Sequence, residues 1–213
     1  MKLNRAGVLR SIRRAVRAPH AAPVPPIDTL ALIERHPAFQ TGGSTVQTNA
    51  IPHYDMSVNT TGCCFKFNPD GWDAQEFHFR DKPFVRAKTH SLMHMPVDMG
   101  RVFSRVQKHM EDAGAVDASN TIVLSRDTSS FAGEHLFAVS KAVPEEEMTT
   151  LSGDFVTKVF EGPYQEARHW HEDMAELVRA RGVEPKSIWF FYTTCPKCAK
   201  AYGKNYVVGV AEV

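Results

Sequence analysis

The segment MTTLSGDFVTKVFE, residues 148–161, is followed directly by Gly162, Pro163 and Tyr164. We expect residues 148–161 to be extended, as a β-strand. Proline is tolerated in the first turn of a helix, because the N–H that it lacks has no helical partner there. The sequence therefore predicts a long strand and then a helix, which begins near Pro163 and ends at Gly182.

The same order of elements is expected earlier in the chain. A helix is predicted from Pro96 to about Ala113, because apolar residues recur there at helical spacing. The expected strands are 84–95, 121–126, 134–143, 148–161, 187–193 and 205–213. Strand, helix, strand, strand thus occurs twice. We expect an α+β fold of duplicated β-α-β-β units, which form a curved antiparallel sheet with two helices on one face and a pocket between the repeats.

The chain divides into three predicted regions. Residues 83–213 form the predicted domain, with repeats at 83–147 and 148–213. Residues 27–82 are expected to be an irregular extension, and residues 1–26 a disordered basic tail with a Pro-rich linker. The tail carries several Arg and Lys side chains beside a possible apolar helical face, so a targeting or membrane-surface helix is the alternative.

Composition narrows the class of partner. The 213 residues are 43% apolar and carry a formal charge of +1, which argues against a nucleic-acid binder with a basic face. No apolar run is long enough to span a bilayer, so a membrane partner is not expected. Four cysteines in a chain of this length favour a reducing compartment such as the cytoplasm over a secreted disulfide scaffold. A small-molecule ligand is the expected partner, and the oligomeric state stays open.

The segment LSGDFVTKVFEGPY, residues 151–164, resembles the gyrase-inhibitor-like (GyrI-like) effector-binding family. The resemblance covers residues 83–213 and implies two β-α-β-β units around a ligand cleft. Members include drug-sensing regulator domains, sequestering proteins and some hydrolases. Similar chains that share Thr-Thr-Gly-Cys-Cys, Asp-Lys-Pro-Phe and Thr-Thr-Cys-Pro-Lys-Cys-Ala-Lys are described as hydrolases. The sequence departs from the wider family at residues 193–200, where TTCPKCAK replaces an acidic stretch, so drug-binding residues cannot be carried over.

Two cysteine pairs are the first candidates for chemistry. The Cys-x-x-Cys spacing of Cys195 and Cys198 suits tetrahedral zinc, and Cys63 with Cys64 is the other thiol pair. Adjacent residues chelate one ion awkwardly, so His53 or His78 could replace one of them. A zinc ion held by four protein ligands would be structural. Two alternatives stay open, namely a redox-active Cys-Pro-Lys-Cys turn with a lowered thiol pKa, and thiols without a role.

Glu134 is the candidate catalytic residue, because it opens a strand that should border the cleft. A carboxylate in an aromatic pocket would have a raised pKa and could act as an acid or base, which the resemblance to hydrolytic GyrI-like proteins also implies. The alternative is a solvated charge at the end of a strand. The candidate ligand-binding side chains are Tyr164, Trp170, Trp189, Phe191 and Tyr192.

Three functions therefore compete. The first is a hydrolase that acts on a small apolar or aromatic compound, with Glu134 as acid or base. The second is a module that sequesters or senses such a compound without turnover. The third is a structural or redox protein that depends on its cysteines. The sequence contains no Walker loop, no Gly-x-Gly-x-x-Gly and no Gly-x-Ser-x-Gly, so nucleotide hydrolysis and serine-esterase chemistry have no support.

Overall fold

The computed structural model describes residues 47–117 and 121–213. The predictions for residues 1–26, and for residues 27–46 of the predicted extension, lie outside the described residues. Within the described part, no helix has the length and apolar content required to cross a membrane.

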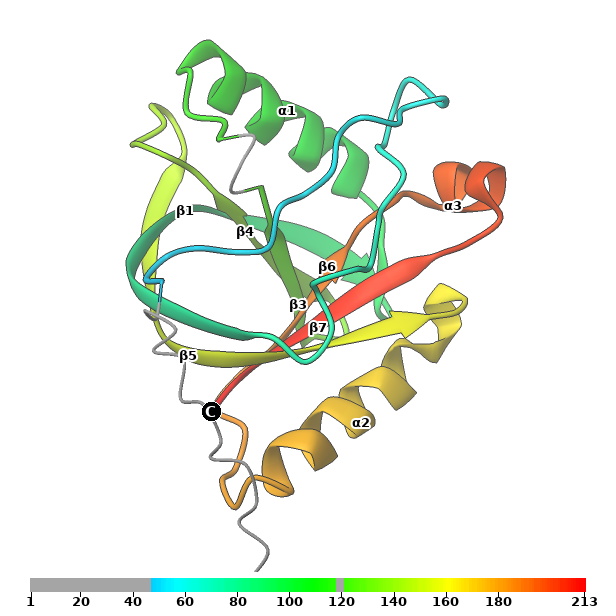
Figure 1. The fold of residues 1–213 in the computed structure, drawn as a ribbon. Coiled ribbons are helices and arrows are strands. Elements are labelled where there is room, and N and C mark those ends of the chain that lie inside the picture. Colours follow the sequence, from blue (N-terminus) through cyan, green and yellow to red (C-terminus); the bar gives the residue numbers. More distant parts are fainter. Residues whose placement is uncertain (1–46, 118–120) are drawn as a thin grey trace, which may run out of the picture. The chain divides into compact units, whose positions relative to one another are not determined.

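Six antiparallel strands form a closed barrel, shown in Figure 1. The strands are β1 (Glu76–Leu92), β3 (Val123–Ser129), β4 (Ala132–Ala138), β5 (Glu147–Glu161), β6 (Ile188–Tyr192) and β7 (Tyr206–Glu212). Their order around the wall is β1-β4-β3-β6-β7-β5, and β5 pairs with β1 to close the ring. A short strand β2 (Met95–Pro96) extends β1 as a hairpin. The α+β class is confirmed, but the predicted open curved sheet is corrected to a barrel.

The long strand β1 explains this closure. It pairs with β5 along its first part and with β4 along its later part, so it belongs to two seams of the wall. The register with β5 shifts between Phe79 and Lys82, where Asp81 has a φ of 50°. Such a bulge bends a strand and increases its twist. The seam between β3 and β6 is much shorter, with Ser125 and Phe190 as its only paired residues.

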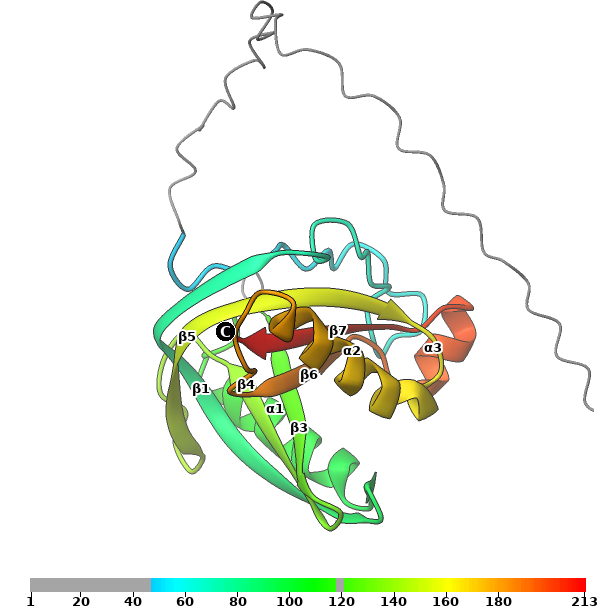
Figure 2. The same cartoon turned by 90° about the horizontal axis from the view of Figure 1, so that it is seen from below.

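Two longer helices pack on the outside of the barrel, as Figures 1 and 2 show. Helix α1 (Met99–Asp112) lies against β1, whereas α2 (Ala167–Arg179) lies against β5, β6 and β7. A single 3₁₀ turn, Tyr164–Glu166, precedes α2. The predicted placement of both helices on one face agrees with this arrangement, because both cover the outer face of the wall, over different strands. A third helix, α3 (Pro196–Tyr202), joins β6 to β7.

Side chains alternate between the inside and the outside of the wall. On β4, Leu136 and Ala138 belong to the interior cluster, whereas Phe137 packs outside against α1. On β6, Trp189 and Phe191 point inward, and Phe190 points outward toward α2. The period of two that is inherent in a strand thus separates the interior core from two outer clusters, one under each helix. The interior is filled by side chains and forms the larger, aromatic core.

The segment before β1 also contributes to this interior. Residues 54–72, which we call the strap, have no regular strand or helix. Tyr54, Phe67 and Trp72 of the strap are buried in the interior cluster, where Trp72 is 0% exposed. The ring of Phe67 lies 6.2 Å from that of Phe191 on β6. The strap is therefore part of the barrel core. The first strand, β1, begins at Glu76 and so starts before residue 83, where the predicted domain began.

Candidate functional site

The first cysteine pair lies in a tight turn of the strap. Gly62 has a φ of 67°, a conformation that favours glycine, and the turn places two consecutive thiols at its end. The backbone N–H groups of Cys63 and Cys64 both donate to Thr61 Oγ1, at 3.3 Å each. The hydroxyl of Tyr202 donates to the Cys64 carbonyl at 2.7 Å. These contacts fix the loop against α3.

The second pair lies at the start of α3. Cys195 is the residue before the helix, and Pro196 occupies the first turn, where proline is tolerated. Cys198 is three residues further on, so its side chain lies on the same side of the helix as Cys195. Gly203 ends the helix with a φ of 72°. The short helix therefore directs both thiols toward the strap.

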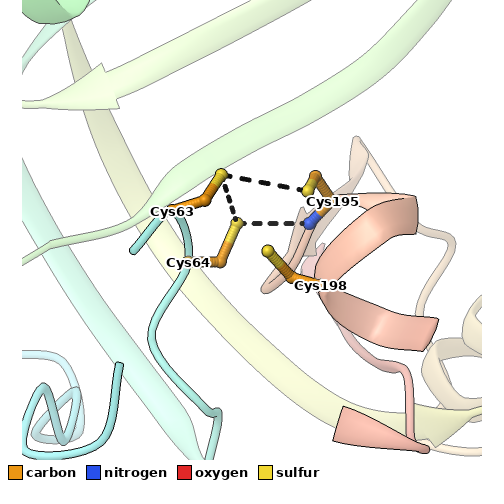
Figure 3. A group of neighbouring side chains, drawn as sticks. All are labelled: Cys63, Cys64, Cys195 and Cys198. Carbon is orange, nitrogen blue, oxygen red and sulfur yellow. Dashed lines mark hydrogen bonds between the residues drawn. The ribbon is translucent and has the colours of Figure 1, made fainter. Parts of the chain in front are cut away.

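The four thiols converge on one point (Figure 3). All four Sγ atoms lie within 4.8 Å of one another. Cys63 Sγ is 3.7 Å from Cys64 Sγ and 4.0 Å from Cys195 Sγ. Tetrahedral zinc with Zn–S bonds of about 2.3 Å requires sulfur–sulfur distances of about 3.8 Å. The donor set and its spacing therefore fit a metal ion, and adjacent Cys63 and Cys64 both take part.

Hydrogen bonding and burial shift the pKa values of two of the thiols in opposite directions. The Thr61 hydroxyl lies 3.2 Å from Cys198 Sγ, and this hydrogen bond lowers the pKa of Cys198 to about 6. Burial raises the pKa of Cys64. The N–H of Cys195 donates to Cys64 Sγ at 3.4 Å, as backbone groups commonly do at cysteine-bound metals. His78, the alternative ligand, instead contacts Asp154 Oδ1 through Nδ1 at 3.0 Å.

Glu134 lies on the inward-facing side of β4 with its side chain 7% exposed. Two arginines from the neighbouring strands hold its carboxylate. Arg126 on β3 reaches Oε2 through Nε at 2.8 Å and Nη2 at 2.7 Å. Arg86 on β1 places Nε 2.9 Å from Oε1, as an ion pair without the alignment of a hydrogen bond. The guanidinium of Arg126 also stacks over Trp189, with 4.1 Å to the ring centroid.

Comparison with known proteins adds a family to this geometry. A family model described as bacterial hydrolase matches residues 54–213. The chain belongs to the bacterial hydrolase family. The match begins at Tyr54, so it spans the strap with its cysteine pair, the Glu134 carboxylate and the second cysteine pair. No curated protein sequence matches the chain.

The five predicted ligand-binding aromatics do not lie together in the structure. Trp189 and Phe191 are buried in the barrel interior. Trp170 belongs to α2 and lies between this helix and the outside of the wall, where it stacks on Phe160. Tyr164 and Tyr192 form a separate ring pair with centroids 5.9 Å apart, and the Tyr164 hydroxyl donates to the Thr194 carbonyl at 2.6 Å. Three of these five side chains are thus buried in the interior core or in the cluster under α2.

A pocket of about 340 Å³ lies between the strap and β6, α3 and β7. Lys66 and Phe67 of the strap form one side, and Thr194, Tyr202 and Lys204 line the other. Its volume is in the range of small-molecule sites. Because Tyr202 and Thr194 also adjoin the cysteine cluster, the strap shapes both the thiol centre and this pocket.

The sequence interpretation missed a buried polar group of three side chains, centred on His135. Its Nδ1 lies 2.9 Å from Ser125 Oγ, and its Nε2 lies 2.9 Å from Thr89 Oγ1. The Phe103 ring of α1 covers the imidazole at 4.9 Å. Burial lowers the pKa of His135 from 6.5 to about 4. The alternation of β4, with Glu134 inward, indicated that His135 would face outward, but not that α1 would bury it.

We expect His135 to make the protein less stable in mild acid. Its pKa is lower in the folded state than in the unfolded state, so the unfolded chain binds more protons between pH 6.5 and 4. The stabilisation is complete above pH 6.5 and is lost as the pH falls toward 4. Between pH 7 and pH 4.5 the free energy of unfolding is expected to fall by about 2–3 kcal/mol through this group. Urea unfolding of the wild type and of His135→Gln across this range measures the difference, and parallel pH profiles would contradict it.

Proposed function

We propose that this bacterial hydrolase cleaves a small apolar or aromatic compound at the mouth of the barrel, around Glu134. The buried carboxylate between Arg86 and Arg126 carries the proposal. Buried acidic side chains are uncommon unless they are paired or functional, and this one adjoins two partly exposed cationic groups. Trp189, beneath Arg126, supplies apolar surface at the same place.

The surroundings of Glu134 favour a role as a base. Two arginines take the place of the predicted aromatic walls, and an ion-paired carboxylate can accept a proton from an attacking water molecule. The guanidinium groups of Arg86 and Arg126 can stabilise negative charge that develops on the substrate. In this proposal Glu134 touches the water, and the arginines touch the group that is cleaved.

Replacement of Glu134 tests the proposal. With a substrate found by screening p-nitrophenyl esters, Glu134→Gln is expected to lower kcat/KM by about 10²–10⁴-fold, the usual contribution of a general base. Glu161→Gln is the matched control, since Glu161 is half-exposed and pairs with Lys204, not with Arg86 or Arg126. Circular dichroism establishes that both variants fold. Unchanged turnover in a folded Glu134→Gln variant would rule out the role.

We also propose that the four cysteines bind a structural Zn²⁺. Support comes from the four thiols within 4.8 Å and from their origin in two segments far apart in the chain. Four protein ligands leave no open coordination position, so the ion would attach the strap to α3 and take no part in hydrolysis. All four cysteines are free of disulfides, which supports a reducing compartment such as the cytoplasm.

Binding without turnover is the second candidate function. It is favoured by one observation: both carboxylate oxygens of Glu134 are already engaged by arginines. A ligand would then be sequestered, and the Glu134→Gln and wild-type proteins would show no hydrolysis.

The architecture supports a wider relationship to GyrI-like proteins, which we propose for this chain. Leaving aside β2 and α3, the elements follow the order strand, helix, strand, strand before residue 139 and again from β5 onward. This recurrence supports an origin from two related halves.

A further inference from the structure

We propose that the barrel mouth binds the substrate of the proposed hydrolase through an oxyanion group, a carboxylate or a phosphate, held by Arg86, Arg126 and Lys88. The inference rests on the proposed function and adds the class of compound that the site accepts. It starts from three cationic side chains that surround one buried carboxylate.

The strand register brings these side chains to one face. Lys88 is directly opposite Glu134 across the β1–β4 seam, and Arg126 is directly opposite it across the β4–β3 seam. Residues that face each other across antiparallel strands point to the same side of the sheet. Arg86 lies two residues before Lys88 on β1 and therefore shares this side. The four side chains thus form one group that spans three adjacent strands.

The charges in this group do not balance. Glu134 is shared by both arginines. Among the described residues, the only other carboxylate paired with this group is Glu147, whose side chain is 53% exposed and lies 3.3 Å from Arg86 Nη1. Lys88 is exposed and makes no ion pair with any residue that the structure describes. Because an exposed ion pair contributes little, an incoming anion can displace Glu147 at low cost.

The arginines are also positioned in advance. Glu134 holds Arg126 by two N–H groups, and stacking on Trp189 fixes the plane of the guanidinium. The side chains of Arg86 and Arg126 remain 36% and 38% exposed. Neither Arg86 Nη2 nor Arg126 Nη1 has a partner among the described residues, so each can donate outward. Preorganised guanidinium donors suit carboxylate and phosphate groups and lose little entropy on binding.

A surface pocket of about 500 Å³ provides room beside this group. Arg86 and Lys88 line it, together with Arg105, His109 and residues 145–147. The carboxylate of Glu146 in that pocket is already paired, since Arg105 Nε and His109 Nδ1 lie 3.0 Å and 2.9 Å from its Oε1. The anion is therefore expected at the Arg86 and Lys88 side, and the rest of the molecule can extend into the pocket.

Titration of the full chain with benzoate, phenyl phosphate and neutral benzamide tests the proposal. The probe is the NMR signals of the Trp189 indole N–H and the Arg126 Nε–H. We expect saturable shifts with benzoate, phenyl phosphate or both, which identifies the preferred oxyanion, and none with benzamide. Binding should weaken as ionic strength rises. Equal binding of benzamide and both anions, or no binding of either anion, would overturn the proposal.

Two variants locate the site. Lys88→Gln removes a cation that holds no ion-pair partner among the described residues, and it should weaken anion binding about tenfold. The matched control Lys66→Gln removes the same charge in the pocket beside the strap and should bind as the wild type does. The double variant Arg126→Gln with Glu134→Gln removes one charge of each sign, leaves Arg86 its ion pair with Glu147, and should abolish the shifts. Loss of binding in Lys66→Gln alone would place the anion elsewhere.

The two proposals fail in different ways. Saturable anion binding without turnover of any ester would contradict hydrolysis and leave the oxyanion site intact. Turnover of neutral substrates that depends on Glu134, with no anion binding, would contradict the oxyanion site alone.

Discussion

Removal of metal from the purified protein is expected to lower its melting temperature by about 10 °C or more. The ion would join the turn at Cys63 and Cys64 to the start of α3, which holds Cys195 and Cys198. A structural zinc site is absent from the unfolded chain, so its binding free energy contributes directly to folding. Without the ion, the strap depends on its apolar contacts and on the hydrogen bond from Tyr202 to Cys64.

The measurement combines metal analysis with thermal unfolding. Mass spectrometry should find one zinc per chain, and the four thiols should react with a thiol reagent only after chelation. A variant with all four cysteines replaced by serine should melt at the lower temperature, and chelator should change it no further. Purified protein without metal, with reactive thiols and a melting temperature that chelator does not change, would contradict the zinc proposal and favour redox chemistry.

Trp72→Ala is expected to destabilise the protein by about 3–5 kcal/mol, the usual cost of removing a buried large aromatic side chain. Trp72 is 0% exposed, and its ring lies 5.5 Å from that of Phe67 and 5.6 Å from that of Phe191. It therefore fills the space where the strap enters the interior of the barrel. Thr157 Oγ1 also donates to the Trp72 carbonyl at 2.7 Å, which fixes the backbone on β5.

Trp72→Phe is the matched control for this variant. The indole Nε1 of Trp72 is buried without a hydrogen-bond partner among the described residues, so phenylalanine loses volume but no hydrogen bond. We expect its cost to be about 1–2 kcal/mol, since part of the aromatic packing is kept. Urea unfolding with the metal content held constant compares the two variants. Equal stability of the alanine and phenylalanine variants would show that the strap is not anchored by this ring.

The sequence predicted the order of the main elements, because alternation and helical spacing are local properties. It did not predict the barrel, since closure depends on the pairing of β1 with β5 and on the bulge between Phe79 and Lys82. Helix α3 was missed as an element, although Pro196 and Gly203 mark its two ends. Seven residues make a weak periodic signal, whereas proline and glycine at these positions are typical of a helix start and stop.

The candidate site was predictable to different degrees. The sequence predicted that the two cysteine pairs could meet, because a zinc ion with four thiolate ligands needs both. It did not predict the turn at Gly62, which directs the adjacent thiols of Cys63 and Cys64 to the same site. Glu134 was correctly expected near the start of a strand, whereas its arginine partners depend on the register of three strands. The predicted grouping of aromatic side chains in one pocket neglected the alternation of side-chain direction along a strand. Trp189 and Tyr192 are three residues apart on β6, so they point to opposite sides of the wall.

The short seam between β3 and β6 makes the barrel unequal around its circumference. Ser125 and Phe190 are the only paired residues there, while β1 and β5 are joined along most of their length. Backbone pairing therefore joins β1 to β5 over a long stretch, whereas it joins β3 to β6 at one residue pair. Arg126 on β3 stacks on Trp189 of β6, so a side-chain contact joins these two strands where they have the fewest paired backbone residues. A ligand held by Arg126 would therefore bind beside the seam of the wall that has the fewest paired backbone residues.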